Sequence, residues 1–332
     1  MARKAKVAVL YGGCGQEHDI SRASAAAVLR HLDRDRFDPV GIYVTRTGQW
    51  LVDGQPLPGT VDCALGGLTH AQNVLRSCDV AFPVMHGRCG GDGTVQALLE
   101  LIGVPYVGSG VLSTAAALDK EVTRRLLAAA GLTVTDTVVL GERDHLSEAD
   151  RDRLGLPSFV KPARGGCGIG VSRVTCWPDL SPAVALARAG DVKVLVEPEV
   201  TGREIGVAVL AHPDGRVVAG PPLEIVLPQR RAFFDHLARY GDRDTVLRVP
   251  ARLDPTLDEL LRAQAVHAYR ALDCRGQACV DFFADEDTAP VLHGVSTVPD
   301  LTARSPVPRI WAATGLSFTG LLTVLLDTAL RR

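Results

Sequence analysis

The chain has 332 residues, of which 46% are hydrophobic and 22% are charged, and its formal net charge is −2. This length predicts two or three globular domains, and the near-neutral charge argues against a nucleic-acid partner or any other extended polyanion. The eight cysteines include no C-x-x-C pair, so the sequence favours neither a zinc site nor a disulfide scaffold and indicates a reducing, cytoplasmic environment.

The first third of the chain alternates predicted strands with predicted helices. Its strands are predicted at 6–11, 37–45 and 78–85, and its helices at 22–32, with Ser21 as a cap, and at 94–103. Such alternation predicts a parallel sheet with helices on its faces. The loops after the strands contain Glu17 and His86, at the edge where ligands bind in such sheets. The apolar run at 6–11 is too short for a signal-peptide core.

The middle of the chain begins with a predicted helical segment at 109–132, for which Gly131 is a suitable C-terminal residue. Strands are then predicted at 133–140, 157–163, 169–174 and 192–200. The polar stretch at 141–156 is predicted to be solvated loop and short helix.

The last third is predicted to contain strands at 203–211, 216–227, 277–285 and 289–296. A helix is predicted to start at Asp254 and Pro255, and its apolar side has the 3.6-residue period of a packed helix: Leu261, Ala265, Ala268 and Leu272. The apolar segment at 315–330 is too short for a membrane span, so we expect a buried C-terminal helix and no membrane partner.

Two segments could bind phosphate. The segment FVKPARGGCGIGV places Lys161 before a loop with four glycines, whose backbone N–H groups could approach phosphate closely. A plain hairpin turn with an exposed lysine is the alternative. Lys120 is predicted in the first turn of a helix, where a cation is unfavourable unless it meets an anion or solvent.

Three carboxylates could bind other polar groups. Glu197 and Glu204 could accept hydrogen bonds from an adenine amino group and from ribose hydroxyls, or could be solvated charges. Glu17 could bind a substrate ammonium group. Alternatively, Glu17 complements a helix dipole while Asp19 or Ser21 caps that helix.

In order and spacing, the longer segments of the chain resemble the D-alanine–D-alanine ligase family of the ATP-grasp superfamily nearly end to end. The segments are GGCGQEHDIS, MHGRCGGDGTVQALLELIGVPYVGSG, ALDKEVTRRLLAAAGL, VKPARGGCGIGV, VEPEVTGREIGVAVL, FFDHLARY, CRGQACVDFF and TVPDLT. The resemblance implies an α/β and α+β fold. A pre-ATP-grasp parallel-sheet domain (1–108) is expected first, followed by a two-part ATP-grasp fold with a central subdomain (109–197) and a C-terminal subdomain (198–332).

The family mechanism that this resemblance implies is acyl transfer in two steps. ATP phosphorylates the carboxylate of one D-alanine, and the amine of a second D-alanine then attacks the acyl phosphate. Mg²⁺ neutralises the triphosphate. The expected partners are these small amino-acid substrates and, because family members are commonly homodimers, a second copy of the chain.

The resemblance also implies residue roles. The ATP phosphates are expected to contact two lysines and the glycine-rich loop: Lys120, Lys161, Gly166, Cys167, Gly168 and Gly170. Adenine and ribose are expected to meet two carboxylates and three rings: Glu197, Glu204, Phe159, Phe233 and Phe283. Glu17 matches the group that binds the first ammonium, and His86 lies beside that substrate. Arg239 matches a phosphate-facing lysine. Tyr240 closes the site and favours an amine acceptor, because relatives that make D-alanyl-D-lactate tend to carry histidine there. Ser305 matches the serine that holds the second carboxylate.

The segment HGVSTVPDLT departs from the family pattern. The family's bridging glutamate and asparagine are replaced by Gly294 and Ser296, so Asp281 is the one metal ligand retained. Cys279 replaces an arginine that faces the tetrahedral intermediate, and Asp300 replaces a glycine that cradles the acceptor. The glycine-rich loop also loses two hydroxyls, since GSS has become GCG.

These losses predict a weakened Mg²⁺ site beside a retained ATP site, and weak or absent D-Ala-D-Ala synthesis. His293 is expected to face away from Gly294, toward the adenine wall or the core, and is a poor magnesium ligand. Asp300 is expected at the acceptor end. Three interpretations stay open: a slower ligase; a ligase for other substrates in specialised metabolism, whose acceptor lacks a carboxylate or carries a cation; and a pseudo-ligase that binds nucleotide or a partner without turnover.

Overall fold

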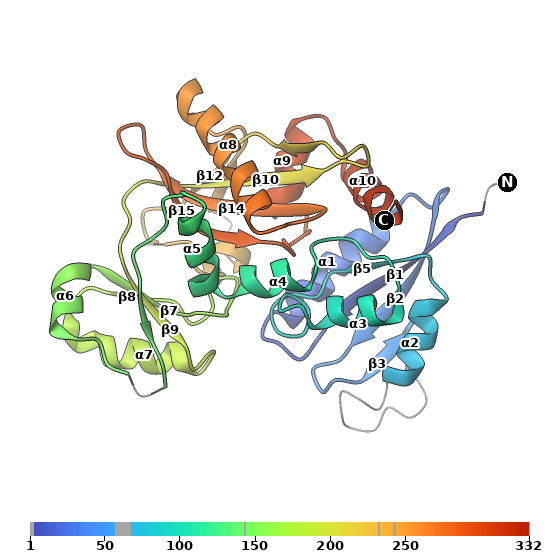
Figure 1. Cartoon of the computed structure of the whole chain (residues 1–332), viewed down its shortest axis with the longest axis horizontal. Coiled ribbons are helices and arrows are strands. Elements are labelled where there is room, and N and C mark those ends of the chain that lie inside the picture. Colours follow the sequence, from blue (N-terminus) through green and yellow to red (C-terminus); the bar gives the residue numbers. More distant parts are fainter. Residues whose placement is uncertain (1–2, 57–67, 143, 232, 242–243, 332) are drawn as a thin grey trace.

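The computed structural model describes residues 3–56, 68–142, 144–231, 233–241 and 244–331, which form three β-sheets with helices packed around them (Figure 1). The mixed α/β and α+β architecture expected from the sequence is confirmed. In the described part of the chain no helix alone is long and apolar enough to cross a membrane. Two consecutive helices, Pro306–Ala313 and Phe318–Leu330, meet that criterion only as a pair bent by 103°.

The first sheet has the strand order β4-β3-β2-β1-β5. Its parallel centre consists of β1 (Ala5–Gly12), β2 (Phe37–Val44) and β5 (Val80–Pro83), as predicted. Two short antiparallel strands that were not predicted extend it, β3 (Trp50–Val52) and β4 (Gln55–Pro56). The associated helices are α1 (His18–His31), α2 (Leu68–Arg76) and α3 (Thr94–Ile102).

Helix α1 begins earlier than predicted, and neither Ser21 nor Asp19 caps it. Its N-cap residue is Glu17, which makes no side-chain capping bond. Ser21 lies inside the helix and is buried, where its hydroxyl accepts from the Gly12 N–H (2.8 Å) and donates to the Val84 carbonyl (2.7 Å). These bonds tie α1 to the ends of β1 and β5, which outweighs the capping preference of serine because buried polar groups need partners.

The central sheet is antiparallel, with the order β6-β9-β7-β8. Its strands are β6 (Val138–Leu140), β7 (Ser158–Pro162), β8 (Ser172–Val174) and β9 (Val194–Pro198), and α6 (Glu148–Leu154) and α7 (Leu180–Arg188) accompany it. The predicted strand at 133–140 is therefore shorter than expected. Before the sheet, the predicted helical segment is divided into α4 (Val111–Leu118) and α5 (Lys120–Ala129), and Gly131 has the expected positive φ of 84°.

The C-terminal sheet has the order β13-β12-β10-β14-β15, with β11 beside β10. Its strands are β10 (Arg203–Ala211), β11 (Val217–Ala219), β12 (Leu223–Val226), β13 (Val246–Arg248), β14 (Gln277–Ala284) and β15 (Val291–Ser296). Helix α8 (Pro255–Ala271) starts after Asp254, whose side chain accepts from Thr256 N as predicted, and its predicted apolar side is buried.

Opposite faces of the C-terminal sheet pack in separate cores. Helix α8 shares one core with Ile205, Val207 and Val280. Helices α9 (Pro306–Ala313) and α10 (Phe318–Leu330) cover the other face and join it to α1, β1 and β5. The C-terminal sheet is thereby fixed to the first sheet, and the central sheet lies to one side of both (Figure 1).

Candidate active site

A cavity of about 720 Å³ lies where the three sheets meet. Most of the residues singled out in the sequence line it: Glu17, His86, Lys120, Phe159, Lys161, Gly166, Cys167, Gly168, Glu197, Glu204, Phe233, Arg239, Tyr240, Asp281, Phe283 and Asp300. Of the described residues, Gly170 and Ser305 were also singled out but lie outside this lining. Residues up to 283 positions apart therefore meet in one site, from Glu17 to Asp300.

Glu197 on β9 is the centre of a buried ion-pair cluster. Its Oε1 lies 2.9 Å from Lys161 Nζ on β7 and 2.8 Å from Arg124 Nη1 on α5. Burial alone would raise the pKa of Glu197, but the two cations lower it to about 2. One carboxylate thus faces two buried basic groups; burial lowers the pKa of Lys161 to about 7, and an anionic ligand beside it would favour its charged form.

Arg124 is a member of this cluster that the sequence interpretation missed. It lies one helical turn after Lys120, so the two side chains share a face of α5. The four-residue spacing from Lys120, in a helix already expected to meet phosphate, could have indicated that Arg124 belongs to the site. Burial lowers the pKa of both Lys120 and Lys161.

The glycine-rich loop joins β7 to β8 as a hairpin connection, but the alternative of an exposed lysine is wrong, because Lys161 is only 4% exposed. At Gly166, a Cβ atom would lie 2.2 Å from Glu17 Oε1, so a larger residue cannot occupy this position without displacing Glu17. At Gly168, a Cβ atom would lie 2.9 Å from the Asp235 Cα atom. The loop is therefore packed closely against both Glu17 and the segment 233–241.

Cys167 in the glycine-rich loop contacts both Glu17 and Tyr240. Its Sγ lies 3.3 Å from Glu17 Oε1 and 3.3 Å from the Tyr240 hydroxyl. Burial raises the pKa of the Cys167 thiol to about 12 and raises the pKa of Tyr240 as well. Both groups are therefore neutral near pH 7, and the contact between Cys167 and Tyr240 at the cavity joins two neutral groups.

Aromatic rings form the wall next to Glu197. Phe159 and Phe233 meet edge to face with centroids 5.3 Å apart, and Phe283 and His293 do the same at 4.9 Å. The expectation that His293 and Gly294 face opposite sides is wrong. A register shift where β14 pairs with β15 breaks the alternation, so both residues line the cavity. His293 Nδ1 is buried without a hydrogen-bond partner among the described residues, and burial holds its pKa well below the usual range.

The corner around Asp281 differs from this wall. A Cβ atom built at Gly294 would meet no described atom within 4 Å. The nearby Cys279 Sγ lies 3.6 Å from Asp281 Oδ1, and burial raises the pKa of Asp281. Among the described residues, no group of three or more His, Cys, Asp or Glu side chains is arranged to hold a metal ion.

Arg239 is the cation of this corner. It lies in a π-helical turn (Leu237–Gly241), with its guanidinium 4.3 Å from the centroid of the Phe234 ring. Burial opposes its charge, yet the neighbouring Cys167 and Tyr240, followed by Asp281 and Glu204, raise its pKa. Burial also raises the pKa of Glu204 to about 7. Glu204 belongs to β10 of the C-terminal sheet and Glu197 to the central sheet, so the two carboxylates face the cavity from different sheets.

Asp300 also lines the cavity and belongs to a network of hydroxyl groups. Its Oδ1 accepts from Ser24 Oγ (2.8 Å) and from the backbone N–H of Thr302 (2.8 Å). His86 Nε2 lies 3.4 Å from the same Ser24 hydroxyl. Ser305 contributes only indirectly, because its hydroxyl bonds Thr302 Oγ1 at 2.7 Å instead of lining the cavity. Ser24 was missed because nothing local distinguishes it from the other small residues of α1.

Two antiparallel sheets on either side of a cavity, with a buried lysine, a glycine-rich loop and an acidic strand end facing it, define the chain as an ATP-grasp protein. Family models support a closer assignment. The model described as D-ala D-ala ligase N-terminus matches residues 6–109, and the model described as D-ala D-ala ligase C-terminus matches residues 126–327.

Individual proteins are similar over their whole length. The D-alanine–D-alanine ligase of Mycolicibacterium gilvum (strain PYR-GCK) is 46% identical, with 100% of this chain and 99% of that protein covered. The corresponding ligase of Mycobacterium avium (strain 104) is 44% identical, with 100% and 98% covered. The VanG D-Ala:D-Ser ligase from Enterococcus faecalis has a similar structure (TM-score 0.81, 31% identity, 98% and 100% covered), as does the D-alanine–D-alanine ligase from Coxiella burnetii (0.82, 28%, 99% and 94%). The chain belongs to the D-alanine–D-alanine ligase family.

Proposed function

We propose that the chain is an ATP-dependent carboxylate–amine ligase of the D-alanine–D-alanine ligase type whose synthesis of D-Ala-D-Ala is weak or absent. Full-length similarity to proteins named as such ligases supports the reaction class. The proposal of weak or absent synthesis rests on the corner where Asp281 faces Gly294. Open space lies there, at the position where a second carboxylate would project.

The nucleotide end of the cavity fits ATP. Lys120, Lys161 and the loop of Gly166, Cys167 and Gly168 are proposed to bind the phosphates, with Gly170 shaping the loop from outside the cavity. The base is proposed to lie between the rings of Phe159, Phe233 and Phe283, with Glu197 meeting its amino group and Glu204 the ribose. Lys161 and Arg124 beside Glu197 support an anionic ligand in this part of the site, because a polyphosphate would favour their charged forms.

The metal corner does not fit magnesium held in the usual way. Magnesium binds through oxygen ligands, and among the described residues of this corner Asp281 is the retained family ligand. Arg239 lies in the same corner and is proposed to neutralise phosphate charge there. No catalytic step is therefore assigned to a protein-held metal ion.

The acceptor end is proposed to use the residues around Asp300. Glu17 is proposed to bind the ammonium of the first amino acid beside His86, and Tyr240 to cover the site and favour an amine acceptor. Ser305 is proposed to orient the acceptor end through Thr302. Asp300 repels an acceptor carboxylate, which supports a second candidate: a ligase whose acceptor lacks a carboxylate or carries a cation.

A third candidate is a pseudo-ligase that binds nucleotide without turnover. The specific observation in its favour is again the corner of Asp281, where the retained carboxylate has Arg239, a cation of the chain itself, beside it. Weak magnesium dependence of ATP binding is the property that separates this candidate from the other two.

The decisive experiment measures phosphate release with ATP, Mg²⁺ and D-alanine. The wild type is compared with a variant carrying Gly294→Glu, Ser296→Asn and Cys279→Arg. We expect little phosphate release from the wild type and clearly more from the variant. Robust phosphate release by the wild type would contradict the proposal of weak or absent D-Ala-D-Ala synthesis, and the chain would then be an ordinary ligase. Two further measurements distinguish the ligase for another acceptor from the pseudo-ligase. Calorimetry measures the affinity for ATP with and without Mg²⁺, and a screen of amines and acids then looks for turnover of other substrates.

Domain limits at 108 and 197, a cytoplasmic location and a homodimer are proposed on the family resemblance. Light scattering of the purified chain tests the dimer, and limited proteolysis tests the domain limits.

A further inference from the structure

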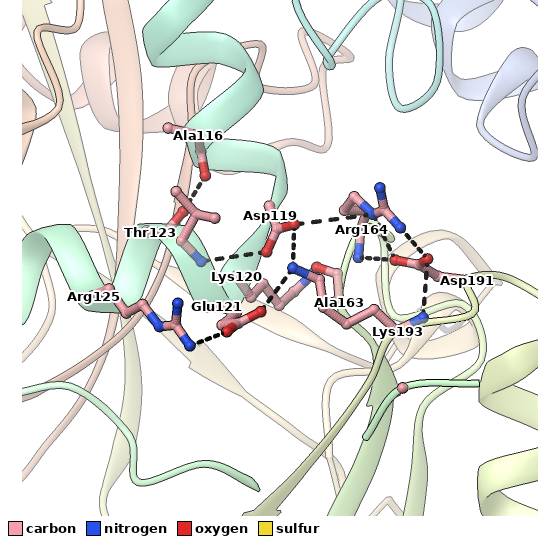
Figure 2. Close-up of polar contacts among 12 residues, drawn as sticks. Ala116, Asp119, Lys120, Glu121, Thr123, Arg125, Ala163, Arg164, Asp191 and Lys193 are labelled. Carbon is pink, nitrogen blue, oxygen red and sulfur yellow. Dashed lines mark hydrogen bonds and ion pairs between the residues drawn. The ribbon is translucent and has the colours of Figure 1, made fainter. Parts of the chain in front are cut away.

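An ion-pair network outside the cavity joins the base of the glycine-rich loop to the start of β9 (Figure 2). Asp191, which precedes β9, accepts two bonds from the Arg164 side chain, at 2.9 Å from Nε and 2.7 Å from Nη2. Its carboxylate also accepts from the backbone N–H of Arg164 (2.9 Å) and of Lys193 (3.2 Å). The Asp191 side chain is 6% exposed. One buried carboxylate therefore fixes both the backbone and the side chain of the first loop residue.

The same network continues to helix α5. Lys193 Nζ lies 2.6 Å from Asp119 Oδ2 and 2.8 Å from Glu121 Oε2. Asp119 is also the N-cap of α5, where it accepts from Val122 N. The first turn of α5 is thus held to the strand end that carries Asp191.

Lys120, the residue between those two carboxylates, points the other way, into the cavity. Its backbone N–H donates to the Ala163 carbonyl (3.2 Å), and its Nζ donates to the carbonyls of Ala163 and Gly165. The Ala163 N–H in turn donates to the Lys193 carbonyl (2.9 Å). Figure 2 shows Ala163, where β7 becomes the loop, beside the ion pairs of Lys193 and Arg164.

None of the charged network residues lines the cavity in the described part of the chain: Asp119, Glu121, Arg164, Asp191 and Lys193. They therefore cannot touch a ligand there. Half-exposed ion pairs contribute little to global stability, so stability alone does not account for a carboxylate that accepts three bonds from one loop residue, Arg164, and a fourth from Lys193. The local consequence is geometric, since a loop binds phosphate only if its backbone N–H groups are pre-arranged.

We infer that the Arg164–Asp191 pair and the Lys193 pairs are positioning groups, which set the glycine-rich loop and Lys120 for a polyphosphate. This inference rests on the proposed nucleotide-binding function. It assigns a role to residues that do not contact the nucleotide, and it predicts that their loss affects ATP more than adenosine, because adenosine has no phosphates for the loop to hold.

The test compares Arg164→Gln with a matched control, Arg36→Gln. Arg36 makes a two-bond pair with Asp327 at 2.8 and 3.2 Å, and its side chain is 47% exposed against 48% for Arg164. We expect Arg164→Gln to raise the ATP Kd about tenfold while the adenosine Kd changes less than about twofold. Arg36→Gln is expected to change neither, and Arg164→Lys to restore part of the ATP affinity.

A second measurement does not depend on nucleotide. Hydrogen exchange of the segment 163–170 in the free protein is expected to be faster in Arg164→Gln, and also in Lys193→Met, than in wild type or Arg36→Gln. Unchanged exchange in both variants overturns the inference even if ATP binds. Equal losses of ATP and adenosine affinity also overturn it. A wild type that binds no ATP contradicts the proposed function instead, and the exchange data still decide whether the network orders the loop.

Discussion

The two ends of the cavity are built on different principles. At the end near Glu197, side chains from β7, β9 and α5 hold one another in a cluster of buried charges, and rings close the wall. At the corner near Asp281, the strands β14 and β15 pair with one register shift, and Gly294 and Ser296 present little or no side chain beside that carboxylate. Gly294 leaves open space there.

The comparison shows that the backbone structure of the metal corner can persist while the side chains needed for catalysis change. Backbone pairing keeps the corner in place when small side chains replace larger ones there, because the sheet hydrogen bonds join backbone groups. The charged cluster has no such independence, since each member is buried and needs the others. Substitutions at the nucleotide end should therefore be costly, and substitutions at the metal corner should be tolerated and alter function.

The largest effect is expected for Glu197→Gln. This change leaves Lys161 and Arg124 buried without their shared carboxylate, and loss of one partner of a buried pair typically costs ~3–5 kcal/mol. We expect the free energy of unfolding to fall by about 3 kcal/mol in urea titrations.

Glu199→Gln provides the control for that measurement. Glu199 pairs with Arg173 at 2.7 Å, but both side chains are about a third exposed (32% and 28%). Its loss is expected to cost less than about 1 kcal/mol. Equal effects of the two substitutions would show that the buried cluster is no more interdependent than a surface pair.

A pH-dependent effect of intermediate size is expected at Glu204. Its pKa is raised to about 7 in the folded chain, whereas an unfolded glutamate has a pKa of about 4.3. Between these values the folded state holds a proton that the unfolded state has lost, so wild-type stability falls as pH rises through this window. Glu204→Gln has no proton to lose. Its stability relative to wild type should therefore grow by about 1–2 kcal/mol from pH 4.5 to 8, less than full linkage because Glu204 faces the cavity.

Glu224→Gln is the matched control on the neighbouring strand. Hydrogen bonds from Arg203 and Arg248 lower the pKa of Glu224, although burial opposes them. Its contribution is lost only as pH falls below about 4. The difference between this variant and wild type should stay constant from pH 5 to 8. A constant difference for Glu204→Gln as well would contradict the raised pKa of Glu204.

The sequence was informative where local pattern decides structure. The period of Leu261, Ala265 and Ala268 gave α8, and Asp254 with Pro255 gave its start. Ordered motifs also located the cavity lining. What could not be predicted depends on tertiary contacts: Ser21 became a buried link instead of a cap, and a register shift turned His293 toward the cavity.

Gly294→Glu tests the tolerance of the metal corner directly. A Cβ atom there meets no described atom within 4 Å, so thermal stability should change little. The new carboxylate adds an oxygen ligand beside Asp281, and we expect Mg²⁺ to strengthen ATP binding about tenfold more than in wild type. Gly294→Gln has the same size without the charge and should show no such gain. If both variants bind ATP as the wild type does, the corner does not lie at the phosphates.

The smallest effect is expected for Tyr240→Phe, at the cavity-lining tyrosine that is proposed to cover the site. The substitution removes the 3.3 Å contact with Cys167 Sγ, a bond between two neutral groups that is worth only ~0.5–1 kcal/mol. Global stability should barely change, but hydrogen exchange in 233–241 should accelerate.

Tyr106→Phe loses a 2.7 Å bond to Glu100 outside the cavity and should leave that segment unchanged. Cys167→Ser should slow exchange instead, since a hydroxyl is a better hydrogen-bonding partner than a thiol. Exchange that is the same in all three variants would mean that the segment 233–241 is held by packing against Gly168 and not by the Tyr240–Cys167 contact.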